Sequence, residues 1–266
     1  MSTFQNKTVL ITGGASGIGK LMASIALQKG SKVIIWDINT ASITATLSEL
    51  QSLGSIFGYT IDITDLAAVK ATAALVKKEQ GTVDILINNA GIVVGKYFHE
   101  HTHEEISRTM AINANAPMHL TLEFLKDMLA QNSGHICTIA SSAGLISNPK
   151  MSVYAASKWS AIGWSDSLRL EMKQLKKNIG VTTVTPYYIN TGMFDGVKSI
   201  VPILQPEKVA RQIIRGIERN KVFVSMPWSV GFVRFFQGLL PIRVFDWFVG
   251  DVMEVYATMN HFKGRQ

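Results

Sequence analysis

Short β-branched runs alternate with helix-length segments along most of this chain, and this alternation limits the possible folds more than any other feature. The runs predict seven strands, at Thr8–Thr12, Lys32–Asp37, Ile56–Asp62, Ile85–Asn88, His135–Ala140, Val181–Pro186 and Val222–Ser225. The segments between them predict six helices, at Lys20–Gln28, Ala41–Leu53, Leu66–Glu79, Glu104–Leu129, Val153–Lys176 and Glu207–Arg219. Such alternation favours a parallel sheet with helices on both faces, and right-handed crossovers make it doubly wound. The predicted fold class is therefore α/β.

Neither a Pro/Ser-rich linker nor an internal repeat divides the 266 residues. We therefore expect a single domain over residues 1–225, followed by a C-terminal helical extension over 226–266. Aromatic residues recur at helical spacing in the extension, among them Phe232, Phe235 and Phe236. We expect this aromatic stripe to pack against protein, either as a cover on a substrate cleft or against another subunit. An amphipathic aromatic helix with cations can also lie in a membrane interface, so peripheral membrane contact through 226–249 is the alternative.

Charge and cysteine content exclude several classes of protein. The 26 Lys and Arg residues exceed the 19 Asp and Glu residues, but they are scattered, so we expect no nucleic-acid partner. A mild cationic excess suits anionic small molecules or an anionic membrane surface. The single Cys137 excludes an intrachain disulfide and is compatible with a reducing, cytoplasmic compartment. We expect neither a signal peptide at Met1–Lys7, which has no apolar stretch, nor a membrane span.

A histidine-rich segment raises the question of a metal site. His99, His101 and His103 alternate with acidic residues such as Glu100 and Glu104. Because the segment is polar and joins the fourth strand to the long helix, we interpret it as a solvated loop and helix start, and we expect no metal.

A glycine-rich turn, Thr12–Gly19, follows the first predicted strand and opens the first predicted helix. Gly13 permits the tight turn, Gly17 lets the backbone approach a pyrophosphate, and Gly19 allows close packing of helix on strand. Free N–H groups at the helix N-terminus would then face the phosphates. At the first β–α junction of an alternating chain, this turn predicts a Rossmann-type dinucleotide site. The predicted contacts in the turn are Gly13, Ser16, Gly17, Ile18 and Gly19.

Asp37 ends the second predicted strand, 18 residues after Gly19, which is close to the usual spacing of a ribose-binding acid. A carboxylate there can accept hydrogen bonds from the adenosine ribose and would repel a 2′-phosphate. Neither Ser16 nor Ile38 supplies a cation for that phosphate. The sequence therefore predicts NAD as cofactor in preference to NADP.

Tyr154 and Lys158 lie four residues apart in a predicted helix, so both project from one face. A nearby ammonium and a positive nicotinamide ring would lower the phenol pKa from its ordinary value of about 10. Tyr154 could then act as general base on an alcohol, or as general acid on a carbonyl. Ser141 follows the fifth strand, where ligands bind to such sheets, and could hydrogen-bond the reacting oxygen. Asn113 is a poor helix former inside the long fourth helix, which indicates a side-chain role or a local kink.

At this point the chain resembles the short-chain dehydrogenase/reductase family, short-form type, over Lys7–Arg219. The residues that carry the resemblance are Thr12-Gly-x-x-x-Gly17-x-Gly19, Asn88-Asn89-Ala90-Gly91, Asn113, Ser141 and Tyr154-x-x-x-Lys158. The resemblance implies that Tyr154 is the acid/base and that Ser141 steadies the substrate oxygen. It implies that Lys158 binds the nicotinamide ribose and tunes Tyr154, and that Asn113 holds a water of the proton relay. Further implied cofactor contacts are Asp62, Ile63, Asn89, Ala90, Gly91, Ile189 and Thr191.

One segment departs from the family pattern, because Pro186-Tyr187 stands where Pro-Gly is frequent. Pro186–Phe194 and the closing Met259–Arg265 are instead similar to the retinol dehydrogenase and long-chain 17β-hydroxysteroid dehydrogenase subgroup. This resemblance implies that Gly192–Gln205 forms a substrate lid with an apolar lining. The predicted substrate contacts are Ser141, Tyr154, Met193 and Phe194.

The sequence thus predicts an NAD-dependent alcohol dehydrogenase that exchanges hydride with a lipophilic alcohol or its carbonyl partner, such as a retinoid, a steroid or a long-chain alcohol. An NADPH-preferring carbonyl reductase and a catalytically silent dinucleotide sensor are the alternatives. The resemblance also implies a homodimer or homotetramer built through Glu104–Leu129 and Val153–Lys176.

Overall fold

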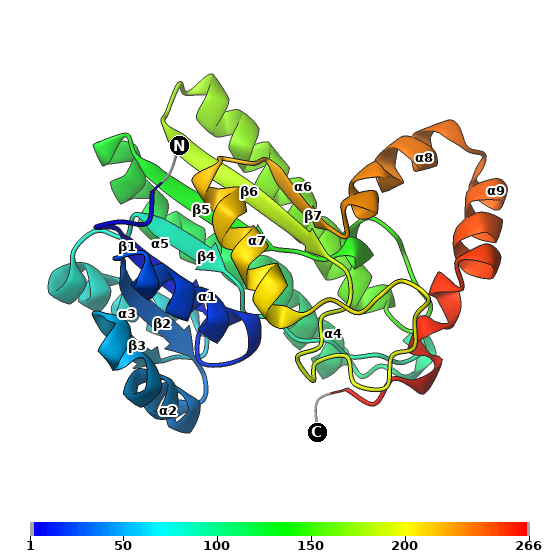
Figure 1. Ribbon diagram of the computed structural model, residues 1–266, viewed down its shortest axis with the longest axis horizontal. Coiled ribbons are helices and arrows are strands. Elements are labelled where there is room, and N and C mark those ends of the chain that lie inside the picture. The colour runs from blue at the N-terminus through cyan, green and yellow to red at the C-terminus, as the bar shows by residue number, and fades with distance from the viewer. Residues whose placement is uncertain (1–2, 265–266) are drawn as a thin grey trace.

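A seven-stranded, entirely parallel sheet forms the centre of the molecule, with the strand order β3-β2-β1-β4-β5-β6-β7 (Figure 1). The computed structural model describes residues 3–264. Residues 1–2 of the predicted domain and residues 265–266 of the predicted extension lie outside this range. The last residue of the closing motif Met259–Arg265 therefore lies outside it as well. The strands are β1 (Thr8–Thr12), β2 (Lys32–Asp37), β3 (Ile56–Thr60), β4 (Ile85–Asn88), β5 (Gly134–Ile139), β6 (Ile179–Pro186) and β7 (Phe223–Met226). The predicted doubly wound α/β fold of Rossmann type is confirmed.

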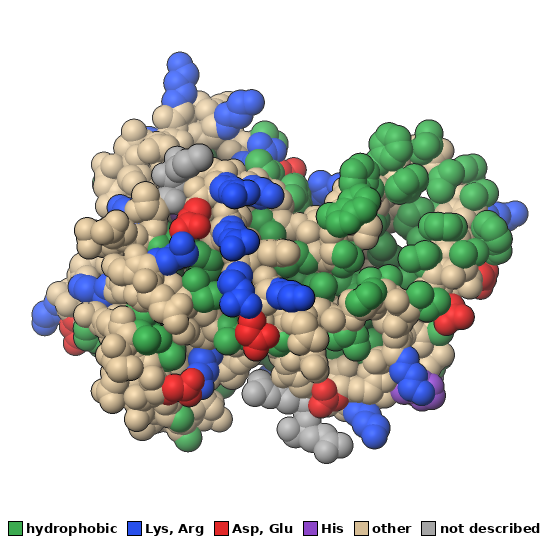
Figure 2. Space-filling model, viewed as in Figure 1, with side chains coloured by type: hydrophobic (Ala, Val, Ile, Leu, Met, Phe, Trp, Pro, Cys, Tyr) green, Lys and Arg blue, Asp and Glu red, His purple; other side chains and the backbone are tan. Residues whose placement is uncertain are grey.

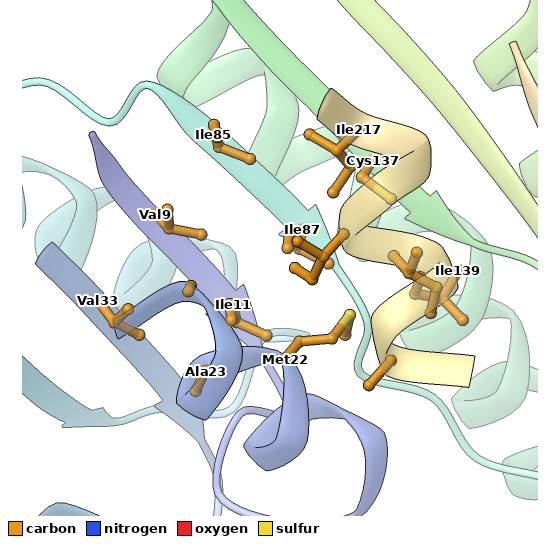
Figure 3. Packing of buried hydrophobic residues seen from close by; sticks show 14 of the residues in the cluster. Val9, Ile11, Met22, Ala23, Val33, Ile85, Ile87, Cys137, Ile139 and Ile217 are labelled. Atoms are coloured by element: carbon orange, nitrogen blue, oxygen red, sulfur yellow. The ribbon is translucent and has the colours of Figure 1, made fainter. Parts of the chain in front are cut away.

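Helices cover both faces of the sheet. They are α1 (Gly17–Gln28), α2 (Thr40–Leu50), α3 (Leu66–Gln80), α4 (His103–Met110), α5 (Ala116–Gln131), α6 (Ser152–Gln174) and α7 (Pro206–Glu218). Alternate residues of β1 separate the two faces: Val9 and Ile11 pack against α1 and α7, whereas Leu10 packs on the side of α3, α5 and α6. Figure 3 shows the first of these layers, in which strand side chains such as Ile87 meet Met22 of α1.

Most predicted element boundaries are correct to within a few residues, and one helix differs in kind. The predicted helix 104–129 is divided into α4 and α5 by a π-helical segment, Ala111–Asn115. β3 ends at Thr60 instead of Asp62, because the Asp62 carboxylate accepts hydrogen bonds from the N–H and hydroxyl of Thr64 and turns the chain. α1 begins at Gly17, three residues earlier than predicted.

Beyond β7 the chain forms an arm of short helices that projects from the body, at the orange and red end of Figure 1. Its elements are the 3₁₀ segment Trp228–Phe232, α8 (Val233–Leu239), α9 (Ile242–Asp246), the π-helical segment Trp247–Val252 and the 3₁₀ segment Val255–His261. The inner side of the arm packs through Val233 and Phe245 against Leu145 and Ile162. Within residues 3–264, none of the helices combines the length and apolar character that a bilayer crossing requires.

Candidate active site

A cleft opens at the carboxyl ends of β1, β4, β5 and β6, the edge where doubly wound sheets bind ligands. The strand order reverses between β1 and β4, so the loops that follow these two strands diverge and leave room between them. Of the residues predicted to form the site, the cleft is lined by Gly13, Ser16, Gly17, Ile18, Asn89, Ala90, Gly91, Ser141, Tyr154, Lys158, Ile189, Thr191, Met193 and Phe194.

The glycine-rich turn forms one end of this cleft, and its geometry explains the glycines. Gly13 and Gly17 adopt left-handed φ angles of 62° and 53°, which side chains disfavour. A Cβ on Gly19 would lie 2.1 Å from the carbonyl oxygen of Gly13, so only glycine lets the helix approach the turn this closely. Asn89 holds the turn from the neighbouring strand, since its Nδ2 donates to the carbonyl oxygens of Thr12 (2.9 Å) and Gly13 (3.1 Å).

Ser16 is the N-cap of α1, but its side chain makes no capping hydrogen bond. The first N–H groups of α1 therefore lack the side-chain acceptor that usually caps a helix. Because Ser16, Gly17 and Ile18 all line the cleft, this helix end is open to an anionic ligand.

Asp37 lies at the end of β2, next to the turn but outside the residues that line the cleft. Its two carboxylate oxygens accept hydrogen bonds from the N–H groups of Ala15 and Asn39, each at 3.2 Å. The carboxylate is half-buried and is thus fixed in position while part of it faces solvent. Asp37 therefore both supports the turn and presents a negative charge beside it.

Tyr154 and Lys158 project from α6 toward Ser141, which follows β5, and all three side chains are buried in the wall of the cleft. Lys158 Nζ donates to the carbonyl oxygen of Ile139 (2.9 Å) and lies 5.7 Å from the centre of the Tyr154 ring. The Ser141 hydroxyl accepts the Ala143 N–H at 3.1 Å and also hydrogen-bonds Tyr154. The structure thus brings the predicted catalytic groups together at the end of the cleft opposite the glycine turn.

Burial dominates the acid–base character of Tyr154 and Lys158. Burial raises the pKa of Tyr154 to about 12, although the hydrogen bond with Ser141 acts in the opposite direction. Burial also lowers the pKa of Lys158 to about 8. The predicted lowering of the phenol pKa depends on a nicotinamide ring as well as on Lys158, and it stays a prediction.

Asn113 lies behind the cleft, in the π-helical segment, and is buried. Its Oδ1 accepts the N–H of Ile92 (2.9 Å), while its Nδ2 donates to the carbonyl oxygen of Ile92 (2.9 Å) and to Ser157 Oγ (3.1 Å). The helix is thus irregular at Asn113 and its side chain is fully hydrogen-bonded, while its part in a proton relay stays a prediction. The extra residue of the π-turn directs the amide of Asn113 toward α6 and the loop that follows β4. Such π-turns are frequent at functional sites.

The remaining predicted contacts lie away from the cleft lining. The exposed Asp62 carboxylate is engaged by Thr64, and the backbone hydrogen bond from Thr64 holds the pKa of Asp62 below its usual range. Ile63 packs on the core beneath α3 and α5. Gly19 is buried under the turn. Among the described residues, no group of three or more His, Cys, Asp or Glu side chains could hold a metal ion.

The sequence agrees with this geometry. The sequence model of the short chain dehydrogenase family matches residues 7–200 of this chain. The chain is 36% identical over 265 residues to epidermal retinol dehydrogenase 2 of Mus musculus, covering 97% of this chain and 85% of that protein. It is 35% identical over 265 residues to retinol dehydrogenase 10-A of Danio rerio, covering 88% of this chain and 78% of that protein. The chain belongs to the short-chain dehydrogenase/reductase family. Within that family it is similar to the retinol dehydrogenases, and it is an alcohol oxidoreductase.

A solved short-chain dehydrogenase/reductase from Burkholderia phymatum, in complex with NAD, has the same fold as this short-chain dehydrogenase. The two structures share a TM-score of 0.81 at 24% identity, over 88% of this chain and 94% of that chain. The fold that carries the cleft is therefore one already seen with a dinucleotide in another protein.

Four further residues line the cleft of this short-chain dehydrogenase without having been predicted as contacts, namely Ile139, Ala140, Pro186 and Tyr187. Each lies at or just beyond the carboxyl end of β5 or β6, and that position is the signal that could have identified them. Tyr187 occupies the position that departs from the family pattern. Its hydroxyl hydrogen-bonds Ser199 Oγ (2.9 Å), so it ties the predicted lid to β6.

Proposed function

We propose that this short-chain dehydrogenase is an NAD-dependent alcohol dehydrogenase that interconverts a lipophilic alcohol and its carbonyl partner. One observation carries the proposal. Ser141, Tyr154 and Lys158 are buried together at one end of a cleft whose other end is a glycine turn with an open helix N-terminus. In the proposed organisation, residues 1–225 bind the dinucleotide, 192–205 form the substrate lid and 226–266 form the extension.

The cleft has the features that a dinucleotide requires. Gly13 and Gly17 leave the backbone bare where phosphates would approach, and the N-terminus of α1 offers N–H groups to them. We assign Asp37 to the adenosine ribose and the segments 89–91 and 189–191 to the nicotinamide half. When bound there, a nicotinamide cofactor supplies hydride exchange at its C4 atom.

The protein's own groups then position the alcohol and move its proton. Ser141 donates a hydrogen bond to the reacting oxygen. The Tyr154 phenolate takes the proton of the alcohol, and in the reverse direction the Tyr154 hydroxyl donates that proton to the carbonyl oxygen. Lys158, with a pKa of about 8, stays largely protonated at neutral pH and favours the phenolate form of Tyr154. Asn113 fixes the loop at Ile92 beside Lys158 and is assigned to the proton relay.

The choice of NAD rests on Asp37. Its carboxylate is held by two backbone N–H groups at the end of β2, where a 2′-phosphate would meet a negative charge. An Asp37→Ser variant should lose preference for NAD over NADP by about 10- to 100-fold in kcat/KM. A matched control is Asp65→Ser at the start of α3, which should leave the preference unchanged. A wild-type enzyme that uses NADPH as well as NADH would instead support the carbonyl reductase alternative.

A lipophilic substrate is supported by the side chains around Tyr154. Phe194 lies edge-on to Tyr154, with ring centres 6.1 Å apart, and also edge-on to Tyr188, with ring centres 5.0 Å apart. Met193 and Phe194 line the cleft, as expected for the substrate contacts. A second cavity of about 440 Å³ is lined almost entirely by apolar side chains and shares Tyr187 with the cleft. Volumes of this size accommodate small lipophilic ligands.

The central test is Tyr154→Phe, which removes only the hydroxyl. Turnover, followed as reduced nicotinamide absorbance with NAD and a panel of alcohols of increasing chain length, should fall by at least 100-fold. Binding of NADH, followed by its fluorescence, should persist. The control Tyr59→Phe, at the far edge of the sheet, should retain both activities. Near-normal turnover in Tyr154→Phe would refute the mechanism, and a wild-type protein that binds NADH but oxidises no alcohol would support the sensor alternative.

We further propose a homodimer or homotetramer that works in the cytoplasm. The long helices α5 and α6 expose Leu122, Trp159 and Leu170, which supports an interface along them. Cys137 is buried and unpaired, and burial keeps its thiol from ionising by raising its pKa, so the chain contains no disulfide that would require an oxidising compartment.

A further inference from the structure

The outer side of the arm exposes an unusual amount of aromatic surface. Trp228, Phe235 and Trp247 are 77%, 62% and 58% exposed, and Phe232, Leu239 and Ile242 add to the same surface. The inner side of the same arm is apolar and buried against the body. A helical segment that is apolar on both sides is normally covered on both, so the outer side is built to meet an apolar partner.

A row of cations lies beside this arm. Lys208, Arg211, Arg215 and Arg219 follow one another at helical spacing on the exposed side of α7. In residues 3–264 no ion pair or hydrogen bond engages any of these side chains. Figure 2 shows the line of Lys and Arg over α7 and the apolar side chains of the arm on the same face of the molecule.

The cations and the arm meet in one groove. Arg215, Arg219 and Lys221 line it together with Phe223 and Trp228, and no acidic side chain belongs to its lining. Its volume, about 550 Å³, is large enough for a phosphate-bearing headgroup. From Trp228 to Gly264 three cations and three acids balance one another, namely Arg234, Arg243 and Lys263 against Asp246, Asp251 and Glu254. The cationic character of this face therefore comes from α7.

We propose that the outer side of the arm and the cation row of α7 together form a docking face for an anionic lipid bilayer. The exposed Trp and Phe side chains enter the headgroup and acyl-chain boundary, and Arg215, Arg219 and Lys221 bind lipid phosphate. A second copy of this chain fits less well, because it would have to supply acidic groups opposite the groove. The 440 Å³ apolar cavity supports the choice of lipid. Phe236 and Phe248 line it and are themselves exposed, so a docked bilayer would lie at an entrance to the substrate region.

Vesicle flotation tests the proposal with the full chain, and it needs neither cofactor nor substrate. The protein should float with vesicles of phosphatidylcholine mixed with phosphatidylserine in low salt, and much less with phosphatidylcholine alone or in high salt. The triple variant Arg211→Gln/Arg215→Gln/Arg219→Gln should bind on the order of 100-fold more weakly. The matched control Lys70→Gln/Lys78→Gln/Lys126→Gln removes three exposed cations from the other side of the sheet and should bind as the wild type does.

A second variant, Trp228→Ser/Phe235→Ser/Trp247→Ser, tests the apolar part and changes only exposed side chains. It should bind more weakly, and the tryptophan fluorescence of the wild type, but not of this variant, should be quenched by brominated acyl chains. Light scattering without lipid identifies the competing occupant. If the aromatic variant becomes a smaller oligomer and the wild type ignores anionic vesicles, a second copy covers the arm and the proposal is overturned. Equal loss of binding in the control and the α7 variant would also overturn it. Because flotation does not depend on catalysis, failure of the proposed function leaves this result unaffected.

Discussion

Replacement of Lys158 by methionine should stabilise the fold at neutral pH while it abolishes turnover. Lys158 is only 5% exposed, and burial lowers its pKa from the ordinary 10.5 to about 8. The unfolded chain therefore binds more protons than the folded chain between these two pH values. This difference costs ~3 kcal/mol of the free energy of unfolding, with the full cost present below about pH 8. The cost declines as the pH rises toward 10.5, since Lys158 is then neutral in both states.

The net effect of Lys158→Met also includes a lost hydrogen bond. The carbonyl oxygen of Ile139 accepts from Lys158 Nζ at 2.9 Å, and leaving it without a partner costs about 1–2 kcal/mol. Methionine has a similar unbranched stem, so we expect little further loss from packing. The variant should therefore be about 1–2 kcal/mol more stable than the wild type at pH 7 and no more stable, or slightly less so, at pH 10.

Urea unfolding of both proteins at pH 7 and pH 10 measures this difference, and titrations shared by the two chains cancel. Lys126→Met on the exposed side of α5 is the control, because it has no burial cost to release. The reasoning is refuted if the stability difference between wild type and Lys158→Met is the same at both pH values. It is also refuted if the variant is strongly destabilised at pH 7.

Two other substitutions test the turn and the π-helical segment. Gly19→Ala should abolish NADH binding, because its Cβ would lie 2.1 Å from the Gly13 carbonyl oxygen and the turn would have to move. The control Gly238→Ala, whose Cβ would meet nothing, should bind NADH normally. Normal binding by Gly19→Ala would contradict the geometry. Asn113→Ala should lower the free energy of unfolding by about 2–4 kcal/mol, since the N–H and carbonyl of Ile92 both lose their partner. The control Asn260→Ala, at an exposed position, should change this free energy by less than about 0.5 kcal/mol. Urea unfolding of both variants and the wild type measures these differences.

The pKa of Tyr154 marks the point where sequence reasoning stops. The four-residue spacing correctly places Tyr154 and Lys158 on one side of α6, because helix geometry is local. Whether the pair attracts strongly enough to ionise the phenol depends on how much water each group loses. That loss is set by packing from Ser141, Phe194 and other residues distant in the chain.

The C-terminal arm also shows where inference from the sequence stops. Its aromatic spacing predicts helices, and helices form there. The spacing alone leaves open which side of the arm is covered. The structure shows that Val233 and Phe245 face the body, whereas Phe235 and Trp247 are exposed.

The amino-acid order by itself determined the α/β fold, the position of the glycine turn and the Tyr154–Lys158 pair, since each depends on periodicity or steric rules within a few residues. Tertiary structure alone decided the π-turn that turns Asn113 toward Ser157, the presence of Tyr187 in the cleft and the raised pKa of Tyr154. These features arise where segments 19 to 44 residues apart in the chain exclude water from one another, and no local pattern records that exclusion.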